Sequence, residues 1–158
     1  MNNILNYNFW KSLLFRQNDH HRYGVFRHTM MVVYHLFTMK QYKMMTAGLL
    51  HDIGKPYTAK ADAKDLERGH GELSFTNHEE LSYQIIKRWS FVSEYTKLIV
   101  RHHYLIRGMK KAKEKGQLKK YQRLQRVWRG VSDEMKEDLG LFLKADDLAK
   151  KYRWKRKR

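Results

Sequence analysis

The chain has 158 residues, of which 42% are hydrophobic, and this fits one globular domain with a single core rather than two domains. It contains no Cys, so disulfides and thiolate metal sites are excluded, and any metal ion must be held by nitrogen and oxygen ligands. Lys and Arg outnumber Asp and Glu by 33 to 16, and the formal charge of +17 favours a partner that carries phosphate groups.

The sequence shows no signal for export or for membrane insertion. The first residues lack a basic start followed by a long apolar stretch, and no segment approaches the ~20 apolar residues that a membrane span needs. We therefore expect a soluble, cytoplasmic protein that does not enter a membrane.

Apolar residues recur at helical spacing in most segments, and a single Pro and few alternating runs argue against a sheet. The sequence therefore predicts an all-α protein, a compact bundle of about six helices in one domain spanning residues 1–158. In chain order, the expected helices cover Ile4–Phe15, Val25–Met39, Tyr42–Asp52, His78–Trp89, Ser93–Tyr104 and a last helix after Ser132.

Two of these helices carry a clear apolar stripe, which predicts the face that packs against the core. In the second helix the stripe consists of Phe26, Met30, Val33 and Phe37. In the last helix it consists of Met135, Leu139, Phe142, Leu143 and Ala145. Asn77 with Glu80 resembles a capping box for the helix that begins at His78, and Ser132 is the expected cap of the last helix.

Three polar or charged segments interrupt or follow the helices. Residues 57–76 form a Gly-containing connection that is long for a compact domain, which indicates a functional use. Residues 110–129 are strongly basic and poor in apolar residues, so their first half is expected to be mobile. The chain closes with a basic tail, residues 150–158, that contains Tyr152 and Trp154.

Several of the nine His residues stand at apolar helix positions. His28 lies in an apolar run, and His51 and Asp52 follow the apolar segment that ends at the stop signal Gly54-Lys55-Pro56. Each alone has a structural explanation, such as a hydrogen-bonded core His or a helix cap. Buried ionisable groups need a shared partner, however, and taken together these residues are the ligand types of a two-metal centre that activates water.

Five motifs in chain order carry a resemblance to a known family. They are VFRHT, LLHDIGKP, GELSFTNHEELS, LIVRHHY and DLGLFLKADDLAK, and they cover residues 23–150. In their H…HD…D order they resemble the HD-domain metal-dependent phosphohydrolases, and in particular the HD domain of bacterial tRNA nucleotidyltransferases and poly(A) polymerases. Nothing in the chain resembles the nucleotidyltransferase head, so nucleotide addition is not expected.

The resemblance implies one or two divalent metal ions, which leaves Mn, Ni, Fe, Zn and Mg open. It implies that one ion is held by His28, His51, Asp52 and Asp146. A second ion, to which Asp52 bridges, is implied to be held by His78 and by His102 or His103. The spacing does not choose between the last two histidines.

The expected activity is hydrolysis of a phosphate ester by metal-activated water, with Asp52 and Lys55 as catalytic candidates. Lys55, Arg27 and Arg107 are the candidates for substrate binding. For Lys55 the alternative of a cation at a helix end remains open. Arg27 replaces an acidic residue that related proteins often carry before the first His, which indicates a phosphate contact in place of a third metal.

The resemblance implies a nucleotide or an RNA end as the substrate. The basic residues 110–129 and 150–158, with their interspersed aromatic rings, favour nucleic-acid binding. Two alternatives remain open: phosphodiesterase action on a small cyclic nucleotide signal, and a basic RNA-binding module with a structural metal site and no turnover.

Overall fold

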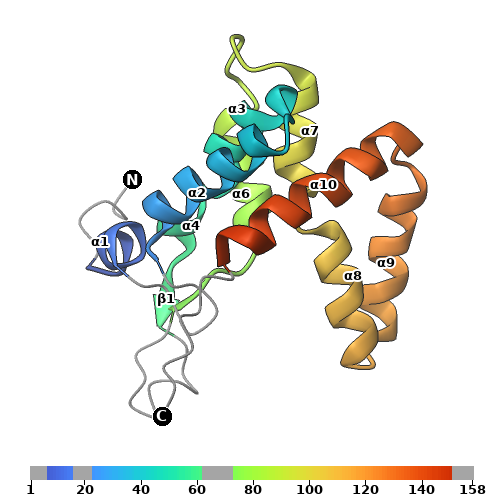
Figure 1. Ribbon diagram of the computed structural model, residues 1–158. Helices are drawn as coiled ribbons and strands as arrows, with labels where there is room; N and C mark the ends of the chain where they lie inside the picture. Colours follow the sequence, from blue (N-terminus) through green and yellow to red (C-terminus); the bar gives the residue numbers. More distant parts are fainter. Residues whose placement is uncertain (1–6, 16–22, 62–72, 151–158) are drawn as a thin grey trace, which may run out of the picture.

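The computed structural model describes residues 7–15, 23–61 and 73–150, and in this part of the chain it is almost entirely helical (Figure 1). This confirms the predicted all-α fold, with more and shorter helices than the six expected. The elements are α1 (Tyr7–Leu14), α2 (Val25–Thr38), the 3-10 helix η2 (Tyr42–Met44), α3 (Met45–Leu50), α4 (Lys55–Thr58), β1 (Lys60–Ala61), β2 (Leu73–Ser74), α6 (His78–Ile86), α7 (Glu94–His102), α8 (Leu105–Glu114), α9 (Leu118–Arg129) and α10 (Asp133–Lys150).

The core forms around α10, which lies between α2 and the pair formed by α8 and α9 (Figure 1). The buried residues of α10 follow helical spacing, because positions 138, 139, 142, 145, 146 and 149 fall on one side of the helix. Leu139, Phe142 and Ala145 are therefore buried as predicted, whereas Met135 and Leu143 are only partly buried. This face packs against α2 and α7, and it carries two acidic residues, Asp138 and Asp146, into the interior.

The predicted core face of α2 is wrong. Phe26 is 62% exposed and Phe37 is 55% exposed, with Met30 exposed between them. The buried residues are instead Val25, His28, Val32 and Leu36. Because α2 is apolar on most of its circumference, spacing alone allowed two offset stripes, and the stripe that contains the polar His28 is the one that faces the core.

The two predicted caps have different outcomes. Ser132 caps α10, because its Oγ accepts a hydrogen bond of 3.3 Å from the backbone N–H of Met135. Asn77 makes no side-chain cap, since its backbone is left-handed (φ 59°), and α6 nevertheless begins at His78 as expected. Glu80 does not reach back to Asn77 but accepts hydrogen bonds from Gln84 and Arg101.

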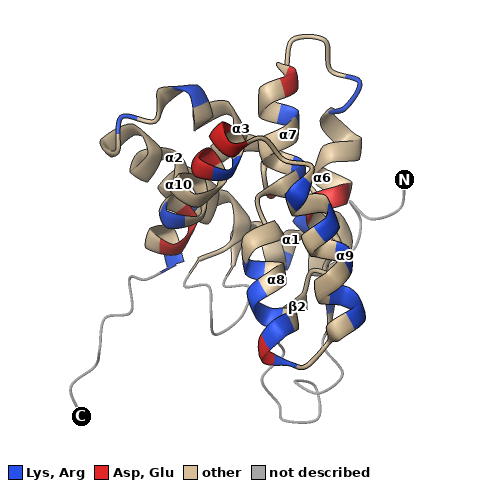
Figure 2. Ribbon diagram, turned by 90° about the vertical axis from the view of Figure 1, so that its right-hand side faces the viewer, with Lys and Arg blue, Asp and Glu red and all other residues tan. Residues whose placement is uncertain are grey.

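The basic block forms a helical hairpin in place of the expected mobile stretch. Helices α8 and α9 pack antiparallel to each other, and Figure 2 shows Lys and Arg along both. The hairpin joins the body through α10. The long connection contains the strand pair β1–β2, which pairs Lys60 with Ser74 and Ala61 with Leu73. Most of this connection and residues 151–158 of the basic tail lie outside the described residues.

None of the helices in the described part of the chain has the length and apolar character that crossing a membrane requires.

Candidate metal centre

Six of the predicted ligand residues converge in the interior from five separate segments. They are His28 on α2, His51 and Asp52 after α3, His78 at the start of α6, His103 after α7 and Asp146 on α10. Each is at most 7% exposed. Burying so many ionisable groups is costly unless they share partners, so their convergence marks the candidate metal centre.

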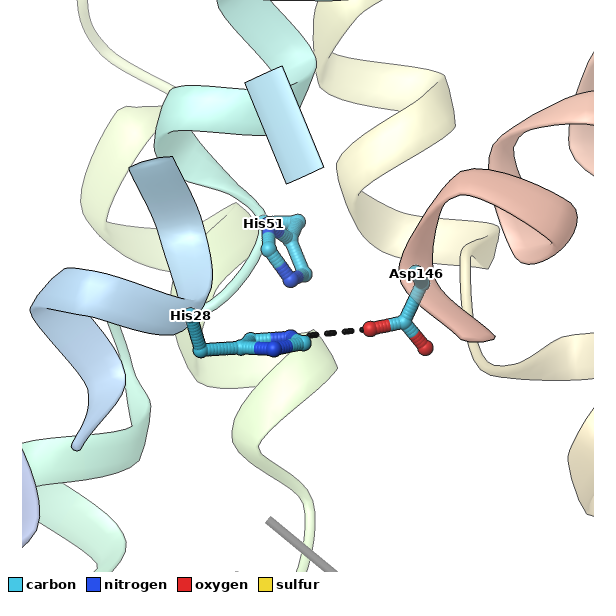
Figure 3. A group of neighbouring side chains, drawn as sticks. All are labelled: His28, His51 and Asp146. Carbon is cyan, nitrogen blue, oxygen red and sulfur yellow. Dashed lines mark hydrogen bonds and ion pairs between the residues drawn. The ribbon is translucent and has the colours of Figure 1, made fainter. Parts of the chain in front are cut away.

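The first ligand group consists of His28, His51 and Asp146 (Figure 3). Nε2 of His28 lies 2.9 Å from Oδ1 of Asp146, and the ligand atoms of all three residues lie within 4.8 Å of one another. The two imidazoles approach from α2 and from the end of α3, and the carboxylate approaches from α10. Helices far apart in the sequence therefore supply one compact set of nitrogen and oxygen atoms.

The second group consists of Asp52, His78 and His103. Oδ1 of Asp52 lies 3.4 Å from Nε2 of His78 and 3.9 Å from Nε2 of His103. Its other oxygen, Oδ2, faces the first group at 3.1 Å from Nε2 of His51 and 3.6 Å from Nε2 of His28. Asp52 thus stands between the two groups with one oxygen directed to each, as a bridging ligand requires.

Backbone carbonyls fix the orientation of three of the four imidazoles. Nδ1 donates to the carbonyl three residues earlier in each case: His51 to Gly48 (2.8 Å), His78 to Phe75 (2.9 Å) and His103 to Val100 (2.7 Å). Because a carbonyl only accepts, Nδ1 must carry the proton, and the lone pair of a neutral ring lies on Nε2. All three Nε2 atoms are turned toward Asp52, which is the arrangement by which outer hydrogen bonds orient metal-binding histidines.

The surroundings keep the imidazoles of His28, His78 and His103 neutral and the carboxylate of Asp52 charged. Burial lowers the pKa of His28, lowers that of His78 to about 4 and lowers that of His103 well below its ordinary value. Burial opposes ionisation of Asp52, but His51 and the Lys55 ammonium outweigh it and hold the pKa of this carboxyl well below its usual range. Neutral imidazole and ionised carboxylate are the protonation states that bind cations.

The central atoms of the site lack hydrogen bonds. Among the described residues, Nε2 of His51 and both carboxylate oxygens of Asp52 are buried without a hydrogen-bond partner, although Lys55 Nζ lies at ion-pair distance, 2.6 Å, from Oδ2. Buried polar atoms in folded proteins are almost always satisfied. A divalent cation would satisfy these atoms, so the residues present fit a metal centre made of nitrogen and oxygen ligands.

The structure distinguishes His102 from His103 and shows where Arg27 and Lys55 lie. His103 belongs to the second ligand group, whereas the neighbouring His102 is only partly buried and lies outside both groups. Arg27 is exposed, stacks on the Tyr23 ring at 4.0 Å and does not line the cavity at the centre. Lys55 begins α4 and is buried beside Asp52, so it is not a cation at the end of a preceding helix.

Asp146 is held on its outer side by two cations. Its Oδ2 lies 3.0 Å from Nη2 of Arg107 and 2.5 Å from Nζ of Lys150, and Arg107 also pairs with Asp147. Although burial opposes ionisation, Lys150, His28 and Arg107 together hold the pKa of Asp146 well below its usual range. Lys150 was not among the predicted site residues, although its position four residues after Asp146 on one helix is the spacing of an ion pair.

The centre opens into a cavity of about 760 Å³. Asp52, His78, His103 and Asp146 line its inner end. The walls carry Lys55, Arg107 and Lys150 close to the ligands, and further lysines from α8 and α9 lie beyond them. The site therefore combines a buried set of metal ligands with an accessible space that is rich in positive charge.

Comparison with known proteins gives one family. No curated protein and no solved structure matches the chain. The HD domain family matches residues 25–149. This range contains all six converging residues, together with Lys55, which pairs with Asp52, and Arg107, which pairs with Asp146. With most of its length matched and its His and Asp residues gathered in two ligand groups, the chain belongs to the HD domain family.

Proposed function

We propose that the protein is a metal-dependent phosphohydrolase that cleaves a phosphate ester of a nucleotide. The single observation that carries this proposal is the position of Asp52, with one oxygen directed to each of two ligand groups at the end of an open cavity. Members of the HD domain family are usually metal-dependent hydrolases, and membership therefore supports the reaction class.

The ligand roles are part of the proposal. His28, His51 and Asp146 would hold one divalent ion, His78 and His103 a second, and Asp52 both. When bound, such ions supply the Lewis acidity that makes water a nucleophile at neutral pH and offsets negative charge on a phosphoryl group. The hydrogen bonds from Nδ1 to the backbone hold the imidazoles in place for this task.

Cationic side chains complete the proposed reaction site. Lys55 and Arg107 line the cavity next to the ligands, at the place where the oxygens of a phosphate would lie. We assign them to binding the phosphate and to neutralising the charge that develops on its oxygens. Asp147 holds Arg107 in position through an ion pair, so the guanidinium meets the substrate without a large loss of side-chain entropy.

A nucleotide is the proposed substrate class for two reasons. The five motifs resemble the HD domain of tRNA nucleotidyltransferases, whose substrates are nucleotides and RNA ends. The cavity also places the aromatic rings of Phe75 and Tyr104 on its walls together with the cations, and this combination suits a base with its phosphate.

The alternative of a purely structural metal site receives less support. Structural metal sites are closed by protein ligands, whereas Asp52, His78, His103 and Asp146 all line the cavity. Several ligands are therefore accessible to a small molecule from outside the core.

The test is turnover of a chromogenic phosphodiester, bis(p-nitrophenyl) phosphate, by the full chain loaded with Mn²⁺ or Ni²⁺. We expect Asp52→Ala to lower kcat/KM at least about 100-fold, since it removes the residue shared by both groups. Lys110→Gln, which changes an exposed residue outside the cavity, is the control and is expected to retain turnover. Equal turnover by wild type and Asp52→Ala would overturn the proposal.

A further inference from the structure

The α8–α9 hairpin concentrates positive charge beside the metal centre. Residues 105–129 contain ten Lys and Arg and a single Glu, out of a formal charge of +17 for the whole chain. Figure 2 shows these cations along both helices. A hairpin with such a surplus attracts anions, but general attraction does not by itself define a binding site.

A subset of these cations is arranged along one side of α8. Arg107 and Lys111 on α8 and Lys115, the residue that caps its C-terminus, follow each other at intervals of four residues on one side of the helix, and all three line the cavity. Lys120 at the start of α9 also lines it and interacts electrostatically with Glu79 on the opposite wall. The charged row thus begins at the ligand Asp146, which Arg107 contacts, and runs outward to the tip of the hairpin.

The outer lysines of this row differ from the inner cations in their partners. Arg107 is paired with Asp146 and Asp147. Within the described part of the chain, Lys111 and Lys115 have no carboxylate partner, and both are exposed. The charges of Lys111 and Lys115 are therefore available to a ligand, whereas Arg107 is also engaged in orienting Asp146.

The length of the row exceeds one nucleotide. Arg107 and Lys115 are separated by about 12 Å along α8, at a rise of ~1.5 Å per residue. A stacked strand rises by about 3.4 Å per nucleotide along its axis, so the row is long enough to meet more than one phosphate. A mononucleotide with its phosphate at the metal centre would leave Lys111 and Lys115 unused.

An aromatic ring lies at the inner end of the row. Tyr104 lines the cavity, its ring centroid lies 5.8 Å from that of His78, and Lys111 Nζ lies 5.7 Å from the Tyr104 ring. Alternating cations and aromatic rings are the pattern by which proteins bind single strands without reading their sequence, since cations meet phosphates and rings stack on bases.

We propose that the cavity-facing side of the α8–α9 hairpin binds a single-stranded oligonucleotide, with the terminal phosphate ester at the metal centre and the following phosphates along Lys111, Lys115 and Lys120. The placement of the strand's end rests on the proposed phosphohydrolase function. The binding of the strand to the hairpin does not, because it depends on the hairpin alone.

The experiment compares two triple variants that remove the same charge from the same hairpin. Lys111→Gln/Lys115→Gln/Lys120→Gln removes the row that lines the cavity. Lys110→Gln/Lys113→Gln/Lys119→Gln removes three exposed lysines that do not line it. All six positions are exposed, so both variants are expected to fold. Binding of a fluorescein-labelled four-nucleotide RNA is measured by anisotropy in EDTA, where no turnover occurs, at several salt concentrations.

We expect the cavity-side variant to weaken binding more than about 10-fold at low salt and to reduce the slope of log K against log salt by about 2, the value for three phosphate contacts with a single strand. In the matched variant, binding should be weaker by less than about threefold, because only the long-range attraction between the protein and the RNA is reduced. UMP and ATP should compete at least about 10-fold more weakly than the unlabelled oligonucleotide. A labelled DNA of the same length shows whether the 2′-hydroxyls contribute.

Two results would overturn the inference: equal weakening by both triple variants, or competition by ATP as strong as that by the oligonucleotide. Turnover of bis(p-nitrophenyl) phosphate by wild type with Mn²⁺ reports separately on the proposed function. If that turnover is absent while the two triple variants still differ in RNA binding, the proposed function fails and the binding row stands.

Discussion

Nε2 of His28 lies 2.9 Å from Oδ1 of Asp146, although 118 residues separate the two in the sequence. The contact joins α2 to α10, the helices whose packing forms the centre of the core. Both side chains are buried, so the packing of α2 against α10 that forms the core also brings the first ligand group together. Changes at the site are therefore expected to affect stability as well as metal binding.

The two adjacent histidines after α7 are expected to behave differently when replaced. His103→Ala should weaken Mn²⁺ binding by about 100-fold or more, because it removes an oriented Nε2 beside Asp52. His102→Ala is the matched control, since His102 lies outside both ligand groups. Isothermal titration calorimetry of both variants checks the prediction. Equal losses in the two variants would contradict the assignment of His103.

Gly54 holds two parts of the site at close distance. A Cβ at this position would lie 2.7 Å from the carbonyl oxygen of His78 and 2.7 Å from the backbone nitrogen of Ser82, and the Gly54 N–H donates to Ser82 Oγ at 2.9 Å. We expect Gly54→Ala to destabilise the protein by about 1–3 kcal/mol, because α6 must move away. The metal affinity of this variant should fall as well, since the movement of α6 separates His78 from Asp52.

Gly140 provides the opposite case. It lies exposed within α10, and a Cβ there would meet no atom within 4 Å. Gly140→Ala is therefore expected to stabilise the protein by about 0.5–1 kcal/mol through its higher helix propensity. Urea unfolding of both variants measures the two effects. A Gly54→Ala variant as stable as wild type would show that α4 and α6 are not packed as described.

Metal-free protein is expected to lose stability as the pH falls from about 6.5 to about 4. Burial lowers the pKa of His78 from 6.5 to about 4, and burial also lowers the pKa of His28 and His103. In this window the unfolded chain binds more protons than the folded protein, so a falling pH favours unfolding. Because one pKa unit corresponds to about 1.4 kcal/mol, His78 alone accounts for about 3 kcal/mol.

The measurement is the urea midpoint in EDTA at a series of pH values. His78→Asn is the control, since it lacks the titrating group and should show a weaker pH dependence. The depressed pKa values of Asp52 and Asp146 act in the same direction, but only below their ordinary value of 3.8. A midpoint that stays constant between pH 7 and pH 4 would contradict the buried, neutral state of these histidines.

Sequence patterns predicted the helices well and their packing less well. The bounds of α2, α6, α7 and α10 agree with the expected segments within a few residues, because each has a strong apolar period or a recognisable start. The prediction of the buried face of α2 was wrong, since Phe26 and Phe37 are more apolar than His28. Periodicity carries no information about the polar partner that His28 finds on α10.

In the candidate site, too, the sequence predicted which residues take part better than it predicted their contacts. The motifs located His28, His51, Asp52 and Asp146, and the structure brings them together. Spacing did not separate His102 from His103, because the choice depends on which ring faces inward at the end of α7. The backbone carbonyls that orient the imidazoles cannot be read from side-chain types at all.

The basic block illustrates a limit of composition. Its low apolar content suggested mobility, yet Gly108 allows α8 to approach α9, where a Cβ would stand 3.4 Å from Leu124. A stretch of high charge can thus form a pair of packed helices, because a few apolar contacts between them are sufficient to hold the pair together. The consequence for the site is that the lysines of the hairpin have defined positions along the cavity.

Anomalous X-ray diffraction from crystals grown with Mn²⁺ shows directly whether metal ions bind beside Asp52. We expect two anomalous peaks, one on each side of Asp52. One should lie about 2.0–2.3 Å from the nearest atoms of His28, His51 and Asp146, and the other at the same distance from those of His78 and His103. Well-occupied peaks elsewhere on the protein with none beside Asp52, or a well-ordered centre without any peak, would contradict the assignment of a two-metal centre.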